Sequence, residues 1–382
     1  MKKIIIIASA ALLALAACTK VEVIDNTPGQ KISFQVANYV TKAAGNNFQA
    51  EASCFYTNAW YSPTSGTANQ HYMDDVKIEL ISGAWQPADA YYWPRTGTLN
   101  FFSYASYNDL AAGEVDPGDD VYGKTFKITG HTVAADDNIM IADAVYFAGK
   151  ASHNADGAMV TDNLASGTTD SGYNGVPTMF RHLLAQVKFN IGLAARTAAT
   201  GTTNWEATVT KARLVKRATK GNLTLTAVDP EGTALQIKAW TPAADGTQVG
   251  WTDAADYTEL LFNSVDTPLK LAANATSGNS EQFLDFTSVL PQTLTDEVVL
   301  EITFNLDTKH GDTVYAHEEG IVVSAKLNTA TTGAAGAIST WCMNKRYTYN
   351  ITIDPVGEII TFDPAVADWT TATGAIDYIA IP

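Results

Sequence analysis

The sequence predicts an all-β protein built from β-sandwiches. One sign is a period of two, seen where Ile32, Phe34 and Val36 alternate with Ser33 and Gln35; such alternation is typical of a half-buried strand. A second sign is that clusters of Gly, Pro, Asn, Asp and Thr separate similar runs and supply turns. A third is that no long stretch repeats its apolar residues at helical spacing. Short strands with turns between them favour packed sheets.

Runs of this kind continue along the chain and suggest two domains. A small, unpatterned stretch at 192–204 marks the predicted boundary between an N-terminal sandwich at 32–193 and a C-terminal sandwich at 194–382. The polar stretch 148–175 is read as a surface excursion, because few of its residues can join a core. We expect further strands at 76–80, 99–104, 187–191, 207–215, 223–225, 298–306, 320–327, 347–353 and 359–362.

The composition excludes some classes of protein. Apolar residues make up 46% of the 382 residues and charged residues 17%, so the chain can build cores and is not a disordered tail. The 24 basic and 40 acidic residues give a net charge of −16. A net negative surface repels phosphate, so we expect no nucleic-acid partner.

The first residues read as an export signal. Lys2 and Lys3 precede an apolar run at 4–17, which is shorter than the ~20 residues that a spanning helix needs. Leu15-Ala16-Ala17-Cys18 resembles the lipobox of bacterial lipoproteins, in which cleavage precedes the Cys and its sulfur receives a lipid. We therefore expect a signal peptide at 1–17, lipidated Cys18 and a tether at 18–31. An ordinary signal peptide with a chance Cys is the alternative.

Two further cysteines, Cys54 and Cys342, lie far apart in the sequence. An exported chain can join such a pair in a disulfide, but spacing alone cannot bring the sulfurs together. We favour two separate thiols and leave the disulfide open.

No motif predicts catalysis or metal binding. His317-Glu318-Glu319 lacks the second His of a zinc-protease helix, and no nucleophile elbow or phosphate-binding loop occurs. The acidic run Asp136-Asp137-Asn138 lacks the spacing of a calcium loop and is interpreted as a solvated turn. We expect no enzyme activity, no cofactor and no metal.

Aromatic residues gather in the first half of the chain. The residues Trp60-Tyr61, Tyr91-Tyr92-Trp93, Tyr104 and Tyr107 could stack on sugar rings, which is one possible surface function. The favoured interpretation is that they cap the core of the first sandwich, because Trp93-Pro94 comes just before a Gly turn and the strand at 99–104.

A succession of local patterns then suggests a family. Its members stand in order at 85–105 (Trp-Gln-Pro to Tyr-Tyr-Trp-Pro-Arg-Thr-Gly), 138–143, 180–189 (Phe-Arg-His-Leu-Leu-Ala-Gln-Val-Lys-Phe), 290–294, 341–349 and 366–369. Together, and behind a lipobox, they resemble the fimbrillin family of Bacteroides-type bacteria, the lipoprotein-derived subunits of type V pili. The resemblance covers nearly all of the mature chain.

The resemblance implies two tandem transthyretin-like β-sandwiches and assembly by strand exchange. In that family a surface trypsin-like protease cuts after a basic residue beyond the first strand. Here the displaced strand would contain Ile32, Phe34 and Val36, and the cut would follow Lys42. The family commonly has Arg at the cut, so an arginine-only protease would spare Lys42. A plain solvated loop charge is the other interpretation of Lys42.

A donor strand is expected at the C-terminal end. Ile376 and Tyr378 lie on one face of this tail, and Ile379 and Ile381 on the other. An ordinary last strand of the second domain is the alternative. The implied protein is a structural and adhesive pilus subunit, an outer-membrane lipoprotein at the cell surface or in the fimbrium. Its partners would be other pilin subunits, the membrane lipid, the protease and a host glycan or protein. The rival is a surface lipoprotein that binds glycans and never polymerises.

Overall fold

The computed structural model describes most of the chain between residues 31 and 368. The described residues are 31–36, 48, 52–63, 70–94, 97–106, 110, 115–116, 125–148, 175–194, 203–226, 236–238, 251–255, 258–262, 268–272, 281–329, 337–354 and 359–368. The elements with defined bounds in this part are strands, apart from one 3-10 helix, η2 (Leu327–Thr329). The all-β class is therefore confirmed. Among the described residues no helix is long and apolar enough to cross a membrane.

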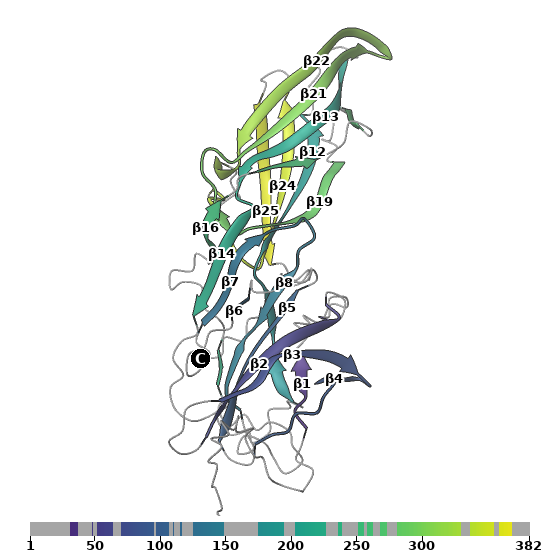
Figure 1. The fold of residues 1–382 in the computed structure, drawn as a ribbon. Helices are drawn as coiled ribbons and strands as arrows, with labels where there is room; N and C mark the ends of the chain where they lie inside the picture. Colours follow the sequence, from purple (N-terminus) through teal and green to yellow (C-terminus); the bar gives the residue numbers. More distant parts are fainter. Residues whose placement is uncertain are drawn as a thin grey trace, which may run out of the picture.

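The molecule is elongated, with the first strands toward one end and a long hairpin at the other (Figure 1). The sheet at the first end has 10 strands, in the order β10-β1-β4-β3-β2-β5-β8-β11, with β9 on β5 and β15 on β9. Its strands are β1 (Phe34–Val36), β2 (Cys54–Ser62), β3 (Gln70–Ile81), β4 (Ala84–Pro87), β5 (Thr98–Ser106), β8 (Ile139–Ala142), β9 (Ala144–Ala148), β10 (Val176–Thr178), β11 (Phe180–His182) and β15 (Gln236–Lys238).

The far end is a pair of sheets that share one core. One sheet has the order β19-β12-β24-β25, and the other β17-β13-β21-β22 with β18 on β13. Alternate residues of β12, β21 and β24 are buried between them, as the period of two requires. The strands are β12 (Ala185–Leu193), β13 (Thr203–Arg217), β17 (Thr258–Phe262), β18 (Leu269–Ala272), β19 (Glu281–Val289), β21 (Val299–His310), β22 (Thr313–Lys326), β24 (Lys345–Asp354) and β25 (Ile359–Asp368).

Smaller sheets lie between the two ends. One has the order β16-β14-β7-β6, and β20 pairs with β23. A second core joins residues of β5 and β7 to residues of β14 and β16. These strands are β6 (Val115–Asp116), β7 (Thr125–Thr132), β14 (Lys220–Thr226), β16 (Trp251–Ala255), β20 (Gln292–Thr293) and β23 (Thr340–Trp341).

Strand pairing crosses the predicted boundary at residue 193. β12, which precedes the boundary, pairs with β19 and β24, whereas β14 and β15, which follow it, pair with β7 and β9. The chain therefore passes between the two ends more than once. The division into domains at 32–193 and 194–382 stays a prediction, because a boundary in the sequence does not say which strands fold together.

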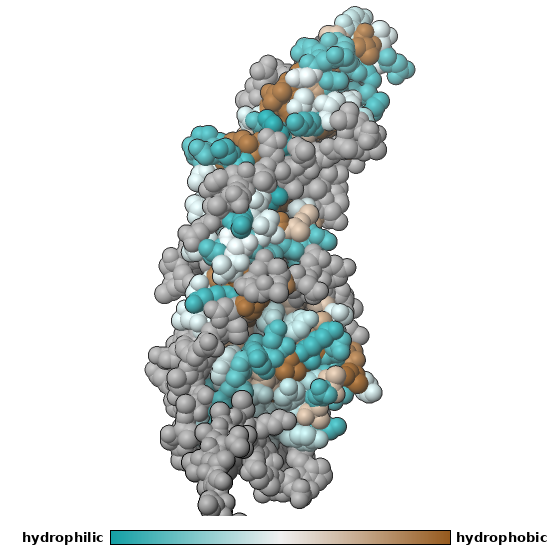
Figure 2. Space-filling model, viewed as in Figure 1, coloured by the Kyte–Doolittle hydropathy of each residue, from teal (hydrophilic) through white to brown (hydrophobic). Residues whose placement is uncertain are grey.

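Most of the predicted runs lie within observed strands, and the structure extends several of them. For example, β22 begins at Thr313, earlier than the predicted start at residue 320. It is exposed along most of its length. The run at 298–306 begins one residue before β21, and the run at 320–327 ends one residue after β22. The face seen in Figure 2 is largely hydrophilic with small hydrophobic patches. Among the described residues the exposed large apolar side chains are Ile81, Val314, Tyr315, Val322 and Val366.

Candidate functional site: the seat of the first strand

β1 lies inside the first sheet, between two neighbours. It runs parallel to β10, with Phe34 opposite Val176, and antiparallel to β4, with Phe34 opposite Trp85. Just before the strand, the Ile32 amide donates to the Tyr91 carbonyl at 2.8 Å, and the Val176 amide donates to the Ser33 carbonyl at 2.8 Å. The earliest described strand is thus an internal one, paired on both edges.

The inward side chains of this segment are almost fully buried. Ile32 is 1% exposed and Phe34 is 3% exposed, while Val36 is half-buried against the same core. The Phe34 ring meets the rings of Phe55 and Phe101 edge to face, with centroids 5.5 and 5.8 Å apart. Such ring pairs add to the ~1.5–3 kcal/mol that each buried apolar side chain contributes. Burial of the Ile32 and Phe34 side chains therefore contributes much of the free energy that keeps β1 in its sheet.

More aromatic rings close the core around β1. Phe48 stacks on Phe180 at 4.3 Å and meets Trp85 edge to face at 5.4 Å. Phe55 contacts both Trp85 and Phe180, at 5.7 and 5.3 Å. Phe55, Trp85 and Phe180 come from β2, β4 and β11. The aromatic core that encloses the β1 side chains, here called the seat of β1, is therefore built largely by other strands.

Gly175 allows β1 to approach β10 closely. Its φ is +126°, and a Cβ at this position would lie 2.6 Å from the Ser33 carbonyl oxygen. No side chain can occupy that space, since the obstacle is main chain. The residue just before β10 must therefore be glycine for this strand pairing to form.

Two of the rings that could stack on sugars, Trp60 and Trp93, belong to the interior, whereas Tyr91 and Tyr92 are half-buried. Trp60 is 5% exposed and Trp93 is 6% exposed. Trp60 stacks on His71 at 4.6 Å, and Trp93 meets Phe101 edge to face at 5.7 Å. Both rings serve the cores, in agreement with the core-capping interpretation.

Buried polar groups elsewhere act as structural links. His131 Nε2 lies 3.0 Å from Asp137 Oδ2, and the same oxygen accepts from the Ala134 amide at 2.7 Å. The solvated-turn interpretation of residues 136–138 is wrong for Asp137, which is 4% exposed. A local acidic pattern could not show that His131, on β7, would supply a partner. Ser288 Oγ donates to the Asp137 carbonyl at 2.6 Å and so ties β19 to this turn.

His182 forms a second buried link, where β11 meets the loop before β24. Its Nδ1 lies 2.7 Å from Asn138 Oδ1, and its main-chain amide donates to Asn344 Oδ1 at 3.4 Å. Burial, reinforced by the charge of Arg346, lowers the pKa of His182 from 6.5 to about 3. A neutral, enclosed imidazole of this kind holds structure together.

The described residues were searched for a metal centre. Among them, no group of three or more His, Cys, Asp or Glu side chains could hold a metal ion. Cys54 and Cys342 are two separate, half-buried thiols.

Some of the predicted site residues are among the described residues, and the others are not. Ile32, Phe34 and Val36 are brought together in the seat of β1. Cys18, Lys42 and the tail residues Ile376, Tyr378, Ile379 and Ile381 lie outside the described residues. Sequence reasoning missed Gly175, although a glycine directly before the strand at 176–178 is a signal of close backbone approach.

Comparison with known proteins now identifies the class. The chain matches the model of the fimbrillin-like family over residues 41–369. The protein belongs to this family. No curated protein sequence matches the chain.

Solved structures of fimbrial and adhesion proteins are similar in fold. A fimbrial protein from Bacteroides vulgatus is 15% identical with a TM-score of 0.50, and the match covers 89% of this chain and 99% of that one. A putative cell adhesion protein from Bacteroides uniformis is also 15% identical, with a TM-score of 0.42 and coverage of 89% and 98%. The tip fimbrial protein of Porphyromonas gingivalis is 12% identical, with a TM-score of 0.32 and coverage of 83% and 94%. The similarity to the Bacteroides vulgatus protein supports the fold. The other two TM-scores are too low to add support. The family assignment supports a fimbrial protein at the cell surface.

Proposed function

We propose that this protein is a structural subunit of a type V pilus that assembles by strand exchange. The observation that carries the proposal is the position of β1, a short internal strand near the start of the chain, whose buried side chains fill a closed aromatic core. Membership of the fimbrillin-like family supports the part of the proposal that makes the chain a fimbrial subunit.

Loss of β1 would create a binding site for another strand. The facing main-chain groups of β10 and β4 would lose their partners, and the pockets of Ile32 and Phe34 would be exposed to water. Unpaired strand edges and alternate apolar pockets are what an added strand satisfies. β1 and β10 have three residues each, so the ladder that must be broken is short.

The C-terminal tail carries a matching pattern. Ile376-Asp377-Tyr378-Ile379-Ala380 can be aligned with Ile32-Ser33-Phe34-Gln35-Val36. Ile376 would then take the Ile32 pocket, Tyr378 the Phe34 pocket and Ala380 the place of Val36. This register puts an aromatic ring where the core requires one, and it puts Asp377 on the outer face beside Gly175. The tail would come from a second copy or another pilin, because a head-to-tail joint continues into a filament.

The remaining features complete the proposal. The chain would be exported as an outer-membrane lipoprotein with its lipid, including palmitate, on Cys18, and a surface trypsin-like protease would cut after Lys42. The fold would be two tandem transthyretin-like sandwiches, the first carrying the seat and the second the tail. A host glycan or protein would be the adhesion partner.

Limited trypsin treatment of the full mature chain tests strand exchange. Cleavage after Lys42 should produce ladders in denaturing gels without boiling, and filaments by negative-stain electron microscopy. Lys42→Gln should abolish both, and so should deletion of residues 375–382. Lys31→Gln is the matched control, since Lys31 is an exposed lysine just before β1 and its loss leaves the Lys42 cut intact.

The register is tested separately with Tyr378→Asp and Asp377→Asn. The first places a charge in the Phe34 pocket and should stop polymerisation, whereas the second changes only the outer face and should not. A cleaved chain that lacks β1, keeps its tail and remains monomeric would overturn the proposal. Labelled palmitate incorporated by the wild type but not by Cys18→Ser tests lipidation independently.

A further inference from the structure

A basic segment crosses the middle of this acidic molecule. Residues 211–220 hold five of the 24 basic residues and no acidic residue, in a chain with a net charge of −16. The segment covers the end of β13 and the start of β14, between the two ends of the molecule (Figure 1). Neither the fold nor strand exchange accounts for this concentration of positive charge.

Arg217, within this segment, is a buried guanidinium without a partner. It is 7% exposed, and its Nε and Nη1 atoms have no hydrogen-bond partner in the structure. Those two nitrogens carry three of the five N–H donors of an arginine.

Other arginines of the described residues are paired. Arg181 binds both carboxylate oxygens of Asp143, at 3.0 and 3.2 Å, and Arg213 binds Glu301. Arg346 donates to Gln186 at 2.7 Å. Arg217 therefore departs from the pattern of its own chain.

The backbone directs Arg217 inward. The β13–β17 register shifts between Leu214 and Arg217, and Lys216 has a φ of +60°, which is unusual for a residue with a side chain. A bulge of this kind re-aims the next side chain. Lys216 is exposed, while Arg217 and the two residues after it are buried.

The neighbouring polar group cannot satisfy the guanidinium. Gln292 Oε1 accepts from the Ala218 amide at 2.9 Å, and its Nε2 donates to the Leu290 carbonyl at 3.0 Å. Arginine stays protonated in proteins, and an unpaired buried charge is strongly unfavourable. Burial lowers the pKa of Arg217, with no carboxylate acting on it. A site that keeps a cation enclosed in this way is suited to an anion.

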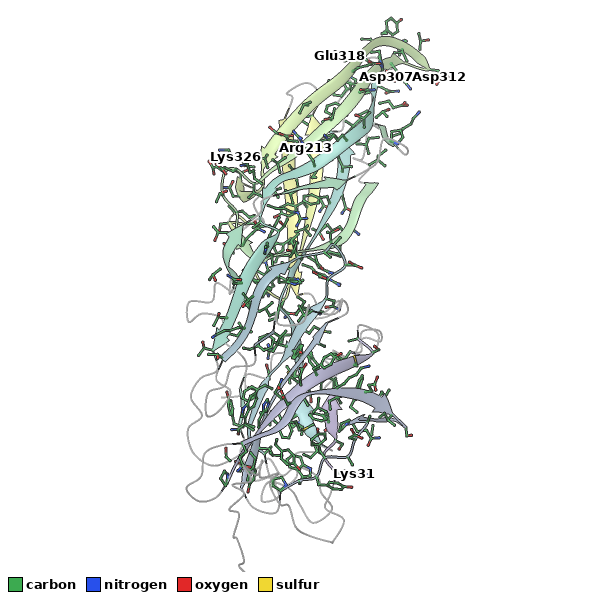
Figure 3. The ribbon with its side chains drawn as sticks, in the orientation of Figure 1. Lys31, Arg213, Asp307, Asp312, Glu318 and Lys326 are labelled. Atoms are coloured by element: carbon green, nitrogen blue, oxygen red, sulfur yellow. The ribbon has the colours of Figure 1, made fainter. Side chains whose placement is uncertain are left out.

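We propose that Arg217 is the binding group of an oxyanion site that takes a carboxylate. Lys216 and Lys220 flank it in the sequence and are exposed, so they add positive potential for an approaching anion. The carboxylate is either a free small molecule or a side chain of a second copy. Figure 3 shows Asp307, Asp312 and Glu318 at the hairpin end, away from Arg213 on β13, so a second copy could present such groups.

Nuclear magnetic resonance of the arginine Nε–H groups in the intact mature chain tests the site directly. Sodium acetate replaces sodium chloride at constant ionic strength, and the Arg217 signal is assigned with Arg217→Lys. The Arg217 signal should shift and saturate in acetate, while the Arg213 signal, from a paired arginine on the same strand, should stay in place. If the carboxylate comes from a second copy, the Arg217 signal should also move with protein concentration, and acetate should reverse that change.

Thermal unfolding gives a second readout. Acetate should raise the wild-type midpoint saturably by about 2 °C or more, and Arg217→Met should remove this rise while Arg213→Met keeps it. In chloride alone, Arg217→Met should be at least as stable as the wild type, because it removes an unpaired buried charge. An Arg217 signal that responds neither to acetate nor to protein concentration overturns the proposal.

Discussion

β1 and β24 occupy the same kind of position at opposite ends of the molecule. Each lies between a parallel neighbour and an antiparallel one: β10 and β4 for β1, β12 and β25 for β24. β24 has 10 residues and pairs along its whole length with β25, whereas β1 has three. β24 is held by main-chain ladders on both edges, and β1 is held largely by the side chains of Ile32 and Phe34.

Under the proposed strand exchange, this difference would allow one protein to contain a strand that stays in place and a strand that is replaced. A long ladder cannot be released without unfolding the sheet around it. A short strand with deep side-chain pockets can be replaced by another segment that fills the same pockets. The substitutions and measurements below test whether this contrast is real.

The largest effect is expected for Phe34→Ala. Truncating this buried ring should cost about 3–5 kcal/mol of stability at the β1 end. The chain should then be cut after Lys42 faster by limiting trypsin. Phe189→Ala, on β12, is the matched variant: it removes an equally buried ring but should not speed that cut selectively. Equal acceleration in both variants would remove the contrast.

Hydrogen exchange should separate the two strands in the wild type. The Ile32 amide, bonded to the Tyr91 carbonyl, should exchange about 100-fold faster than the Tyr349 amide in β24, which corresponds to about 3 kcal/mol. The reason is that β1 can open locally, while β24 opens only with its sheet. Exchange of both amides at one common rate would show that β1 does not open on its own.

Gly175→Ala should weaken β1 by steric conflict with the main chain of Ser33. We expect about 2 kcal/mol of lost stability, measured by denaturant unfolding. Gly83→Ala is the control, because Gly83 also has a positive φ, +86°, but nothing lies within 4 Å of the added carbon. That control should cost only about 1 kcal/mol. Similar losses in the two variants would mean that the approach of β1 to β10 is not tight.

Over a single pH unit, the smallest effect is expected from the His182 link near the start of β24. The unfolded chain binds a proton near pH 6.5 and the folded chain only near pH 3, so acid favours unfolding in between. The contribution is complete above pH 6.5 and should fall by about 1.4 kcal/mol per pH unit within that window. His182→Gln should flatten the pH profile of stability by this amount.

His317, on the exposed hairpin, should act in the opposite sense. Hydrogen bonds to Asp307 and Glu319 raise its pKa, so its contribution is present below the unfolded pKa and is lost as pH rises through the folded one. His317→Gln should therefore leave the acid slope of His182 in place. An unchanged acid slope in His182→Gln would contradict the assignment.

Much of the local structure follows from the sequence because strand periodicity is local. The alternation around Phe34 and in 347–353 predicted strands with one buried face, and the structure buries Ile32, Phe34, Tyr349 and Ile351. The aromatic residues Trp60 and Trp93 were predictable as core from another local pattern, the Trp93-Pro94 pair before a Gly turn and a strand. The candidate site was predictable only in part: the pattern named β1, but not its neighbours.

By itself, the sequence determined the all-β class, the positions of several strands and the family motifs, because periodicity, turn residues and composition act over a few neighbours. Only the tertiary structure decided that β1 lies between β10 and β4, that Gly175 meets Ser33, that His131 holds Asp137, and that Arg217 is enclosed without a partner. These facts depend on pairings between residues distant in the chain, and side-chain pattern alone does not specify which strand edges meet.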